Sequence, residues 1–398
     1  MATENKKYIP ALRFPEFQND GEWKCVIIGD IISTINPPKK LQSSEYKKKG
    51  AFPIVDQSAS YIAGYSDNGD AVIDNNGYNY IVFGDHTCSL KLIDFPFIQG
   101  ADGIKIFKSK ITEVLTEYLY QYIFAHPINS KEYKRHFSDL KEKPLLYPTK
   151  ACEQKKIADC LSSLDKYIDA TKRKLELLKE HKKGLMQRLF PAKGKTLPEL
   201  RFPEFQNDGE WQTMSLGEIT SIVNRRNKSN RSLPIYSINN ADGFVPQSQQ
   251  FAGMDSEARG YDISAYKIIG KHTFAYNPAR INVGSIGYSG ELKDILISSL
   301  YVCFKSMDNV DDDFLMCFFN SYIFNQAVES NVEGGIRSYL FYENFSRINI
   351  AIPSLYEQKR IASCITSIED MIKKTNEQII LFETHKKGLL QQLFPMIK

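Results

Sequence analysis

The chain has 398 residues, 42% of them hydrophobic and 25% charged, with a formal net charge of +4. This length is sufficient for two or more domains with cores of their own, and the balance is that of a water-soluble protein. The start MATENKKYIP has no apolar core, no stretch approaches the length of a membrane span, and the seven cysteines form no C-x-x-C pair, so we expect a cytoplasmic protein with no membrane contact, disulfide framework or zinc site.

The first expected segment, residues 1–23, ends on the dodecamer LRFPEFQNDGEW at residues 12–23. The dodecamer recurs without change at residues 200–211, where it closes a linker that we place at 192–211. Its apolar residues are suited to packing, and QNDGE is typical of a polar turn before a strand. Its acidic residues disfavour contact with nucleic acid. We therefore expect both copies to pack on the helix pair predicted downstream or on a partner protein.

Residues 24–149 form a first variable segment of mixed α/β character. Two β-rich runs, YNYIVF (78–83) and GIKIF (103–107), precede a helical stretch around residues 115–124. The segment carries 15 Lys and Arg against 14 Asp and Glu. Its bulk charge therefore does not attract nucleic acid, and any phosphate contacts must come from local clusters or from a partner.

The next segment, residues 150–191, predicts a long helix that is repeated at residues 354–398. EQKKIADCLSSLDKYIDATKRKLELLKEHKKGLMQRLFP (153–191) recurs as EQKRIASCITSIEDMIKKTNEQIILFETHKKGLLQQLFP (357–395). Pro148 and Pro353 precede the helices, and Pro191 and Pro395 end them. Alternate steps of four and three residues give an apolar seam typical of a coiled coil. Its positions are Ile157, Leu161, Leu164, Ile168, Leu175, Leu178, Leu185 and Leu189 in the first copy, and Ile361, Ile365, Ile368, Ile372, Ile379, Phe382, Leu389 and Leu393 in the second.

Both seams are interrupted at the same places, by Thr171 and Thr375 and by Lys182 and Lys386. The lysines either set the register of the helix pair or extend their ammonium groups out to water, and the sequence leaves both interpretations open. Two such stripes in one chain are expected to pack on each other. Because the connection at residues 192–196 is too short for a long return, we expect the helices to run antiparallel.

Residues 212–353 form a second variable segment. Its β-rich runs YKIIG (266–270), VGSIGY (283–288) and LYVCFK (300–305) precede FLMCFFNSYIFNQAV (314–328). Gly84–Thr87 resembles Gly270–Thr273, and Phe107–Ser109 resembles Phe304–Ser306. We therefore expect one fold in both variable segments, with different surfaces.

No catalytic site is indicated. Asn36-Pro-Pro-Lys39 lacks the aromatic residue with which amino-methyltransferases stack a flipped base. Gly194-Lys-Thr196 resembles the end of a phosphate-binding loop, but Leu189 stands inside the helix where such a loop needs its earlier glycine. His86 and His272 have no serine–aspartate or metal-binding pattern around them, so a core or turn role is favoured.

Clusters of cationic and amide side chains on the variable segments are the candidates for nucleic-acid recognition. Arginine can bind guanine and asparagine can bind adenine through two hydrogen bonds, while lysine contacts phosphate. For any one residue a solvated surface role is the alternative, and the clustering favours recognition. The candidates are Lys47, Lys48, Lys49, Ser58, Lys91, Lys134, Arg135, His136, Asn224, Arg225, Arg226, Asn227, Lys228, Asn277, Arg280, Asn282 and Arg337.

The order of these elements resembles that of the specificity (S) subunits of type I restriction–modification enzymes, over nearly the whole chain. The lead-in L-R-F-P-E-F…W, the helix start EQ-K-x-I-A and the helix end H-K-K-G-L…L-F-P carry the resemblance, and each occurs twice. The expected fold class is α+β, with two similar mixed α/β target recognition domains separated by two long helices that form an antiparallel coiled coil, in a pseudo-two-fold internal repeat. The resemblance also implies double-stranded DNA, two methyltransferase (M) subunits and restriction (R) subunits as partners. S-adenosylmethionine would then be bound by the M subunits, with no cofactor in this chain.

Two different domains that share one geometry suit an asymmetric bipartite DNA target, in which each domain reads one half and the helix pair sets the spacer. The chain itself would be non-catalytic. The competing interpretation is an assembly scaffold whose side domains bind protein, which the near-neutral variable segments favour. A self-contained nuclease or methyltransferase has no motif in its support.

Overall fold

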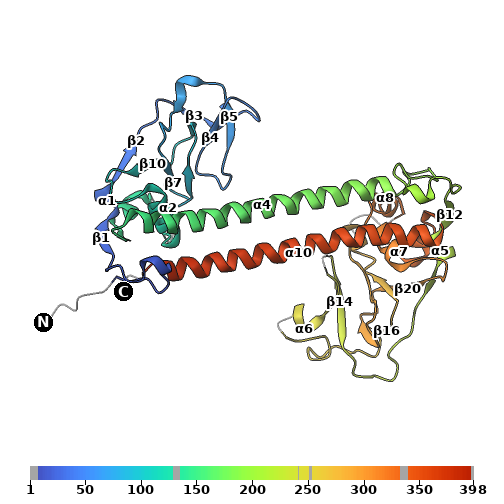
Figure 1. Ribbon diagram of the computed structural model, residues 1–398. Helices are drawn as coiled ribbons and strands as arrows, with labels where there is room; N and C mark the ends of the chain where they lie inside the picture. Colours follow the sequence, from blue (N-terminus) through green and yellow to red (C-terminus); the bar gives the residue numbers. More distant parts are fainter. Residues whose placement is uncertain (1–7, 129–134, 241, 251–252, 332–338, 396–398) are drawn as a thin grey trace. The chain divides into compact units, whose positions relative to one another are not determined.

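The computed structural model describes residues 8–128, 135–240, 242–250, 253–331 and 339–395 (Figure 1). The chain divides into two compact units, one of residues 1–172 and 377–398 and the other of residues 173–376. Each unit contains one variable segment and a part of each long helix. This division cuts across the expected division by segments, because each long helix contributes to both units.

The first unit contains two mixed or antiparallel sheets and one separate ladder. One sheet has the antiparallel order β2-β10-β7-β8, and the other has the order β3-β9-β4-β5, with β6 also paired to β9. β1 pairs with β11. The strands are β1 (Lys24–Ile27), β2 (Ile32–Ile35), β3 (Lys40–Leu41), β4 (Phe52–Val55), β5 (Gly64–Ser66), β6 (Val72–Ile73), β7 (Tyr80–Gly84), β8 (Leu90–Ile93), β9 (Phe97–Gly100), β10 (Ile104–Ser109) and β11 (Pro144–Tyr147), and the α-helices beside them are α1 (Ile28–Ile31), α2 (Thr116–Ala125) and α3 (Phe137–Glu142).

The second unit repeats this topology, except that β3 has no counterpart among its described strands. Its sheets have the orders β13-β20-β17-β18 and β15-β14-β19-β16, and β12 pairs with β21. The parallel pair β4–β9 of the first unit has its counterpart in β14–β19, which confirms the expectation of one fold. The strands are β12 (Gln212–Ser215), β13 (Thr220–Ile222), β14 (Ile235–Asn239), β15 (Gly243–Pro246), β16 (Lys267–Ile269), β17 (Phe274–Tyr276), β18 (Ile286–Tyr288), β19 (Ile295–Ile297), β20 (Val302–Ser306) and β21 (Asn349–Ile352), and the α-helices are α5 (Leu216–Ile219), α6 (Gln247–Gln250), α7 (Asp312–Phe319), α8 (Tyr322–Asn331) and α9 (Tyr342–Phe345).

The topology corrects one expected correspondence between the halves. Gly84–Thr87 lies at the end of β7 and in the turn that leads to β8, whereas Gly270–Thr273 precedes β17. Because β7 and β17 hold the same place in their sheets, His86 and His272 do not occupy equivalent positions. The short G-x-H-T match is a coincidence of sequence.

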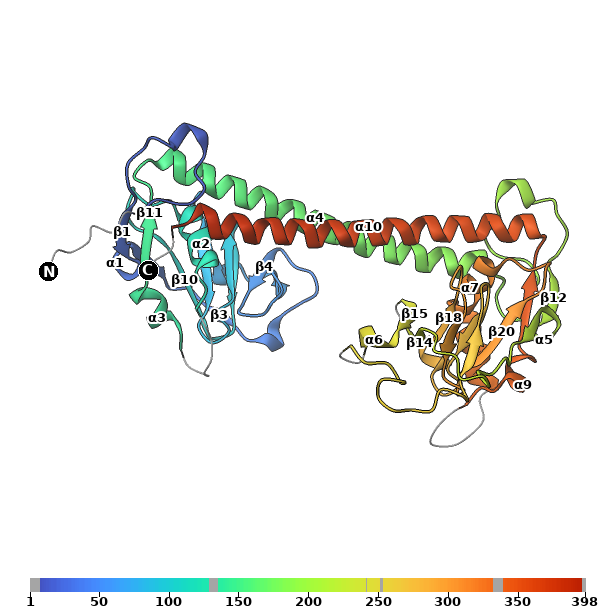
Figure 2. The same cartoon turned by 90° about the horizontal axis from the view of Figure 1, so that it is seen from below.

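Within each unit, the two long helices, α4 (Ala151–Leu189) and α10 (Leu355–Leu393), lie side by side (Figure 2). In the first unit Ile157 of α4 shares a core with Leu393 of α10, and in the second unit Leu189 shares a core with Ile361. The start of one helix thus meets the end of the other in both units, so the expected antiparallel pair is confirmed. Every apolar seam position is buried except six that are half-buried, namely Leu164, Leu178, Leu185, Ile372, Phe382 and Leu389.

The two lysines that interrupt the seam form ion pairs between the helices. Lys182 Nζ lies 2.5 Å from the Glu369 carboxylate in the second unit, and Lys386 pairs with Asp165 in the first. Asp165 and Glu369 are equivalent positions of the long repeat, so the duplication produces the same cross-helix pair twice. A charged residue that must face one particular carboxylate fixes the register of the pair. The register interpretation of these lysines is therefore favoured.

A buried ion pair ties each copy of the dodecamer to the start of a long helix. Arg13 donates to the two carboxylate oxygens of Glu153 at 2.7 and 2.8 Å, and Arg201 donates to both oxygens of Glu357 at 2.8 Å. The carboxylate side chains are only 2% and 1% exposed. Each arginine also donates to backbone carbonyls of the QNDGE turn of its own dodecamer. The dodecamer therefore packs on the helix pair, which was one of its two expected contacts, the other being a partner protein.

The other repeated residues of the helices bind the variable segments. Gln154 accepts a hydrogen bond from the backbone amide that precedes α2 and donates to two backbone carbonyls, and Gln358 makes the corresponding three bonds before α7. At the far end of α4, the ring of Phe190 lies 5.3 Å from that of Phe314 in α7, and Phe394 packs on α2 in the same way. The motifs EQ and LFP are thus the attachment points of each domain.

We expect Arg201→Ala to lower the free energy of unfolding by about 2 kcal/mol, because it leaves the buried Glu357 carboxylate without its partner. Arg188→Ala is the matched control. Arg188 pairs with Glu199 at 2.8 Å, but the two side chains are 51% and 71% exposed, so its loss should change stability little. Urea unfolding followed by circular dichroism measures both variants. Equal losses of stability would contradict the structural role assigned to the buried pair.

Candidate nucleic-acid interface

In the first unit, three of the predicted residues form an exposed cationic turn. Lys47, Lys48 and Lys49 are all exposed, and Lys47 is held by Asp67 at 2.8 Å. The first two line a shallow cavity of about 370 Å³. Ser58 is exposed in a nearby segment of the sequence, where its backbone amide donates to a carboxylate oxygen two residues earlier. Lys48 and Lys49 have no ion-pair partner among the described residues, so they are available to phosphate.

Lys91 is a correction to the predicted set. Its side chain is buried, and its ammonium donates to the backbone carbonyls of Asp56 at 2.7 Å and Ser60 at 2.6 Å. Burial lowers the pKa of this ammonium. Lys91 therefore holds the segment that carries Ser58 in place and offers no surface charge to DNA.

The three predicted residues at 134–136 have different surroundings and are described one by one. Lys134 lies outside the described residues, and Arg135 is exposed. His136 is a second correction, because it is fully buried, with its backbone amide bonded to Asp85 and its Nδ1 facing Asp139 at 3.3 Å. His136 thus belongs to the core at the start of α3.

The cluster at residues 224–228 of the second unit is mostly available for recognition. Asn224, Arg225, Arg226 and Lys228 are exposed. Asn227 is a third correction. It is fully buried, accepts from the amide of Arg231 at 2.9 Å and donates to that residue's carbonyl and to a second one. Its amide therefore shapes the loop that displays its neighbours.

The connection between β17 and β18, residues 277–285, is an ordered loop with exposed recognition side chains. Asn277 caps it by accepting from the amide of Ala279 at 3.0 Å. Backbone bonds from residues 280, 283, 284 and 285 close successive turns. Arg280 and Asn282 are exposed, and neither side chain has a hydrogen-bond or ion-pair partner among the described residues. Arg337, the last predicted residue, lies outside the described residues.

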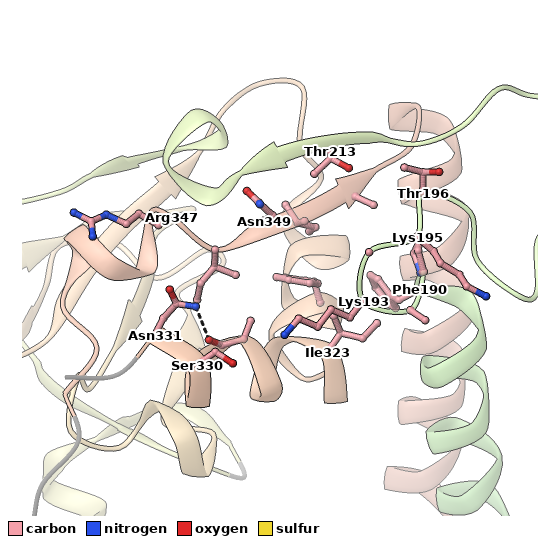
Figure 3. Close-up of a pocket in the computed structure, with 18 residues that line it drawn as sticks. Phe190, Lys193, Lys195, Thr196, Thr213, Ile323, Ser330, Asn331, Arg347 and Asn349 are labelled. Atoms are coloured by element: carbon pink, nitrogen blue, oxygen red, sulfur yellow. Dashed lines mark hydrogen bonds between the residues drawn. The ribbon is translucent and has the colours of Figure 1, made fainter. Parts of the chain in front are cut away.

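The rejected phosphate-loop motif lines a cavity of about 420 Å³ beside the end of α4 (Figure 3). Lys193 extends into this cavity, whereas Lys195 and Arg347 point away from it, and Arg347 pairs with Glu343 at 2.8 Å. The motif enters the lead-in segment rather than a helix, so no row of helix amides is present to cradle phosphates. The geometry agrees with the rejection of this motif.

A groove between the helix pair and the second variable segment was not anticipated from sequence. Its volume is about 760 Å³, and Lys179, Lys182 and Lys373 stand on its helix side while Gly284 and Tyr288 stand on the other. The sequence assigned Lys182 to the helix seam and did not single out Lys179 or Lys373, because all three lie in the repeated helices. Only the tertiary structure brings them beside the loop at residues 277–285.

Two of the cysteines in the described part of the chain, Cys303 and Cys317, are buried in the second unit. Within residues that the structure describes, no group of three or more His, Cys, Asp or Glu could hold a metal ion. Burial raises the pKa of Cys303 and of Cys317 to about 12, which makes both thiols poor nucleophiles at neutral pH. None of the described helices has the length and hydropathy needed to span a membrane.

The chain matches a family profile described as the type I restriction modification DNA specificity domain, first over residues 20–180 and again over residues 208–381. The chain belongs to this family. Type I specificity subunits provide DNA-sequence recognition to complexes with methyltransferase and restriction subunits, and they are in general non-catalytic. The repeated match coincides with the two variable segments and the helices that follow them.

Two relatives have names of this kind, and one solved structure shares the fold. The type I restriction enzyme MjaVIII specificity subunit of Methanocaldococcus jannaschii is 24% identical, over 98% of this chain and 95% of the relative. A second specificity subunit of that organism, MjaX, is 27% identical over 61% of this chain, and the match spans only 56% of that relative's length. The crystal structure of the type I system S subunit from M. genitalium superposes with a TM-score of 0.65 at 16% identity, covering 98% of this chain and all of that one.

Proposed function

We propose that this chain reads an asymmetric, bipartite DNA target, with each variable segment acting as a target recognition domain for one half. The observation that carries this proposal is one strand topology with two different sets of displayed side chains. The connection between β7 and β8 spans residues 85–89, whereas its counterpart between β17 and β18 spans residues 277–285 and displays Arg280 and Asn282. A common scaffold with different side chains in the groove of DNA reads different base sequences.

The proposed role of α4 and α10 is to set the spacer between the two half-sites. Each helix has 39 residues and is thus roughly 58 Å long. The Lys182–Glu369 and Lys386–Asp165 pairs fix the helix register, and a fixed register keeps the spacing constant. Double-stranded DNA would then carry a set number of unread base pairs between the two halves.

The helices also supply the proposed docking positions for two methyltransferase subunits. Leu177 and Leu381 are equivalent positions of the long repeat and are 65% and 63% exposed, and Tyr167 and Met371 are a second equivalent pair at 57% and 44%. Exposed apolar side chains often mark a protein-binding surface. Because these occur at equivalent positions of the repeat, they can bind two copies of one partner. S-adenosylmethionine would be bound by those subunits, and restriction subunits would join the complex through them.

Methylome sequencing of strains with and without the gene tests the reading of DNA, provided that the methyltransferase gene is present in both. We expect one bipartite methylated sequence, with two different halves and a fixed spacer, to be present only with the gene. An identical methylome in the two strains would favour an assembly scaffold and would overturn the proposal.

We expect the double variant Leu177→Glu, Leu381→Glu to lose methyltransferase binding in size-exclusion chromatography, because each glutamate would have to be desolvated in the docked complex. The matched control is Glu176→Gln with Glu377→Gln, which alters exposed helix residues without burying a charge. A double leucine variant that still binds two methyltransferase subunits would place the docking surface elsewhere.

A further inference from the structure

The groove between the helix pair and the second recognition domain presents unpaired positive charge. Lys182 is neutralised by Glu369 at 2.5 Å, and Lys179 pairs with Glu176 of its own helix at 2.8 Å. Lys373 of α10 is exposed and has no ion-pair partner among the described residues. The remaining carboxylate of the lining, that of Asp242, accepts from the side-chain amide of a neighbouring asparagine.

Amide groups complete the groove as a site for an oxyanion. Asn320 and Asn376 line it together with Lys373, as does Asn240, whose amide also donates to the carbonyl of Val283. Such donors, around a cation and along an open groove, suit a phosphodiester strand better than a metal ion or an apolar peptide. Lys373 and the amides of this lining can therefore contact phosphate oxygens, whereas the Asp242 carboxylate cannot.

The groove is continuous with the exposed loop of the second domain. Gly284 lies in its wall with a φ of 85°, a left-handed conformation that favours glycine. The Asn240 side chain donates to the carbonyl of Val283 at 2.6 Å and so fixes this loop to the end of β14. Arg280 and Asn282 belong to the same loop as Gly284.

The first unit has a different set of charges at the corresponding positions. In the long repeat, Asp169 stands where the second unit has Lys373, and Glu383 stands where it has Lys179. Lys172 stands where the second unit has Asn376, but it is paired with Glu383 at 2.6 Å. Phe124 occupies the position of Asn320 and lies under the Lys386 ammonium, 4.0 Å from the ring centroid. The basic groove is thus a property of the second half alone and is not part of the duplicated framework.

We propose that this groove binds one phosphodiester strand of the second half-site, with Lys373 as a phosphate contact, while Arg280 and Asn282 face the bases. This assignment rests on the proposed reading of DNA. Lys373 positions the duplex and carries no sequence information, whereas the loop residues do. The contact would hold the DNA against the helix that sets the spacing.

The test uses the complex of the full chain with its methyltransferase subunits and a duplex that carries the sequence identified by methylome sequencing. A second duplex has the second half-site scrambled. Binding constants are measured over a range of KCl concentrations for the wild type, Lys373→Ala, Lys373→Arg and Lys374→Ala. Lys374 is the matched control, because it is the adjacent exposed lysine of α10 and is absent from the groove.

We expect Lys373→Ala to weaken binding to both duplexes by the same factor and to reduce the slope of log K against log salt by about 0.9, the loss of one phosphate contact. Lys373→Arg should retain the wild-type slope, and so should Lys374→Ala. Arg280→Ala should instead reduce the preference for the intact second half-site. This inference is overturned if the slopes of Lys373→Ala and Lys374→Ala coincide. A wild-type complex that does not distinguish the two duplexes would overturn the proposed function itself.

Discussion

The buried pairing of one arginine with one glutamate in each unit is the constraint on which the attachment of each dodecamer to its helix depends. Glu153 and Glu357 are almost completely removed from water, and a carboxylate in that state requires a partner. Arg13 and Arg201 supply it from the two copies of the dodecamer. Each variable segment begins directly after the dodecamer and ends directly before the helix, so the pair joins the start of the segment to its end. Each domain is thereby closed onto the helix start.

The repeated attachment motifs are the same in both units, whereas the loops away from them differ. The dodecamer, the EQ pair and the LFP end make matching contacts in both units, which accounts for their duplication. The loops that lie away from these attachment points carry different side chains, and the basic groove beside α10 exists in one half only. Recognition residues can therefore change without loss of the framework, which is the property that a specificity subunit of this family requires.

The sequence predicted those features that depend on local pattern. It failed where tertiary contacts decide whether a side chain is buried and which partner it has. Periodicity was sufficient for the two helices and their seam, and even for the place of Lys182, although only the structure supplied Glu369 as its partner. Thr171 is accommodated in the seam because its hydroxyl donates to the backbone carbonyl four residues earlier at 2.7 Å. Among the predicted recognition residues, Lys91 and Asn227 resemble their exposed neighbours in sequence, and nothing local indicates that they satisfy backbone groups inside the fold. The groove lysine Lys373 was missed because a charged helix position has no signal until another element is placed beside it.

Independent reading by the two domains is the central claim, and a domain exchange tests it most directly. Residues 212–353 would be replaced by the corresponding domain of a relative with a different known target, with the dodecamers and both helices kept. Methylome sequencing of a strain that carries this chimera should show a new second half-sequence, with the first half-sequence and the spacer unchanged. A change in both half-sequences would contradict the account.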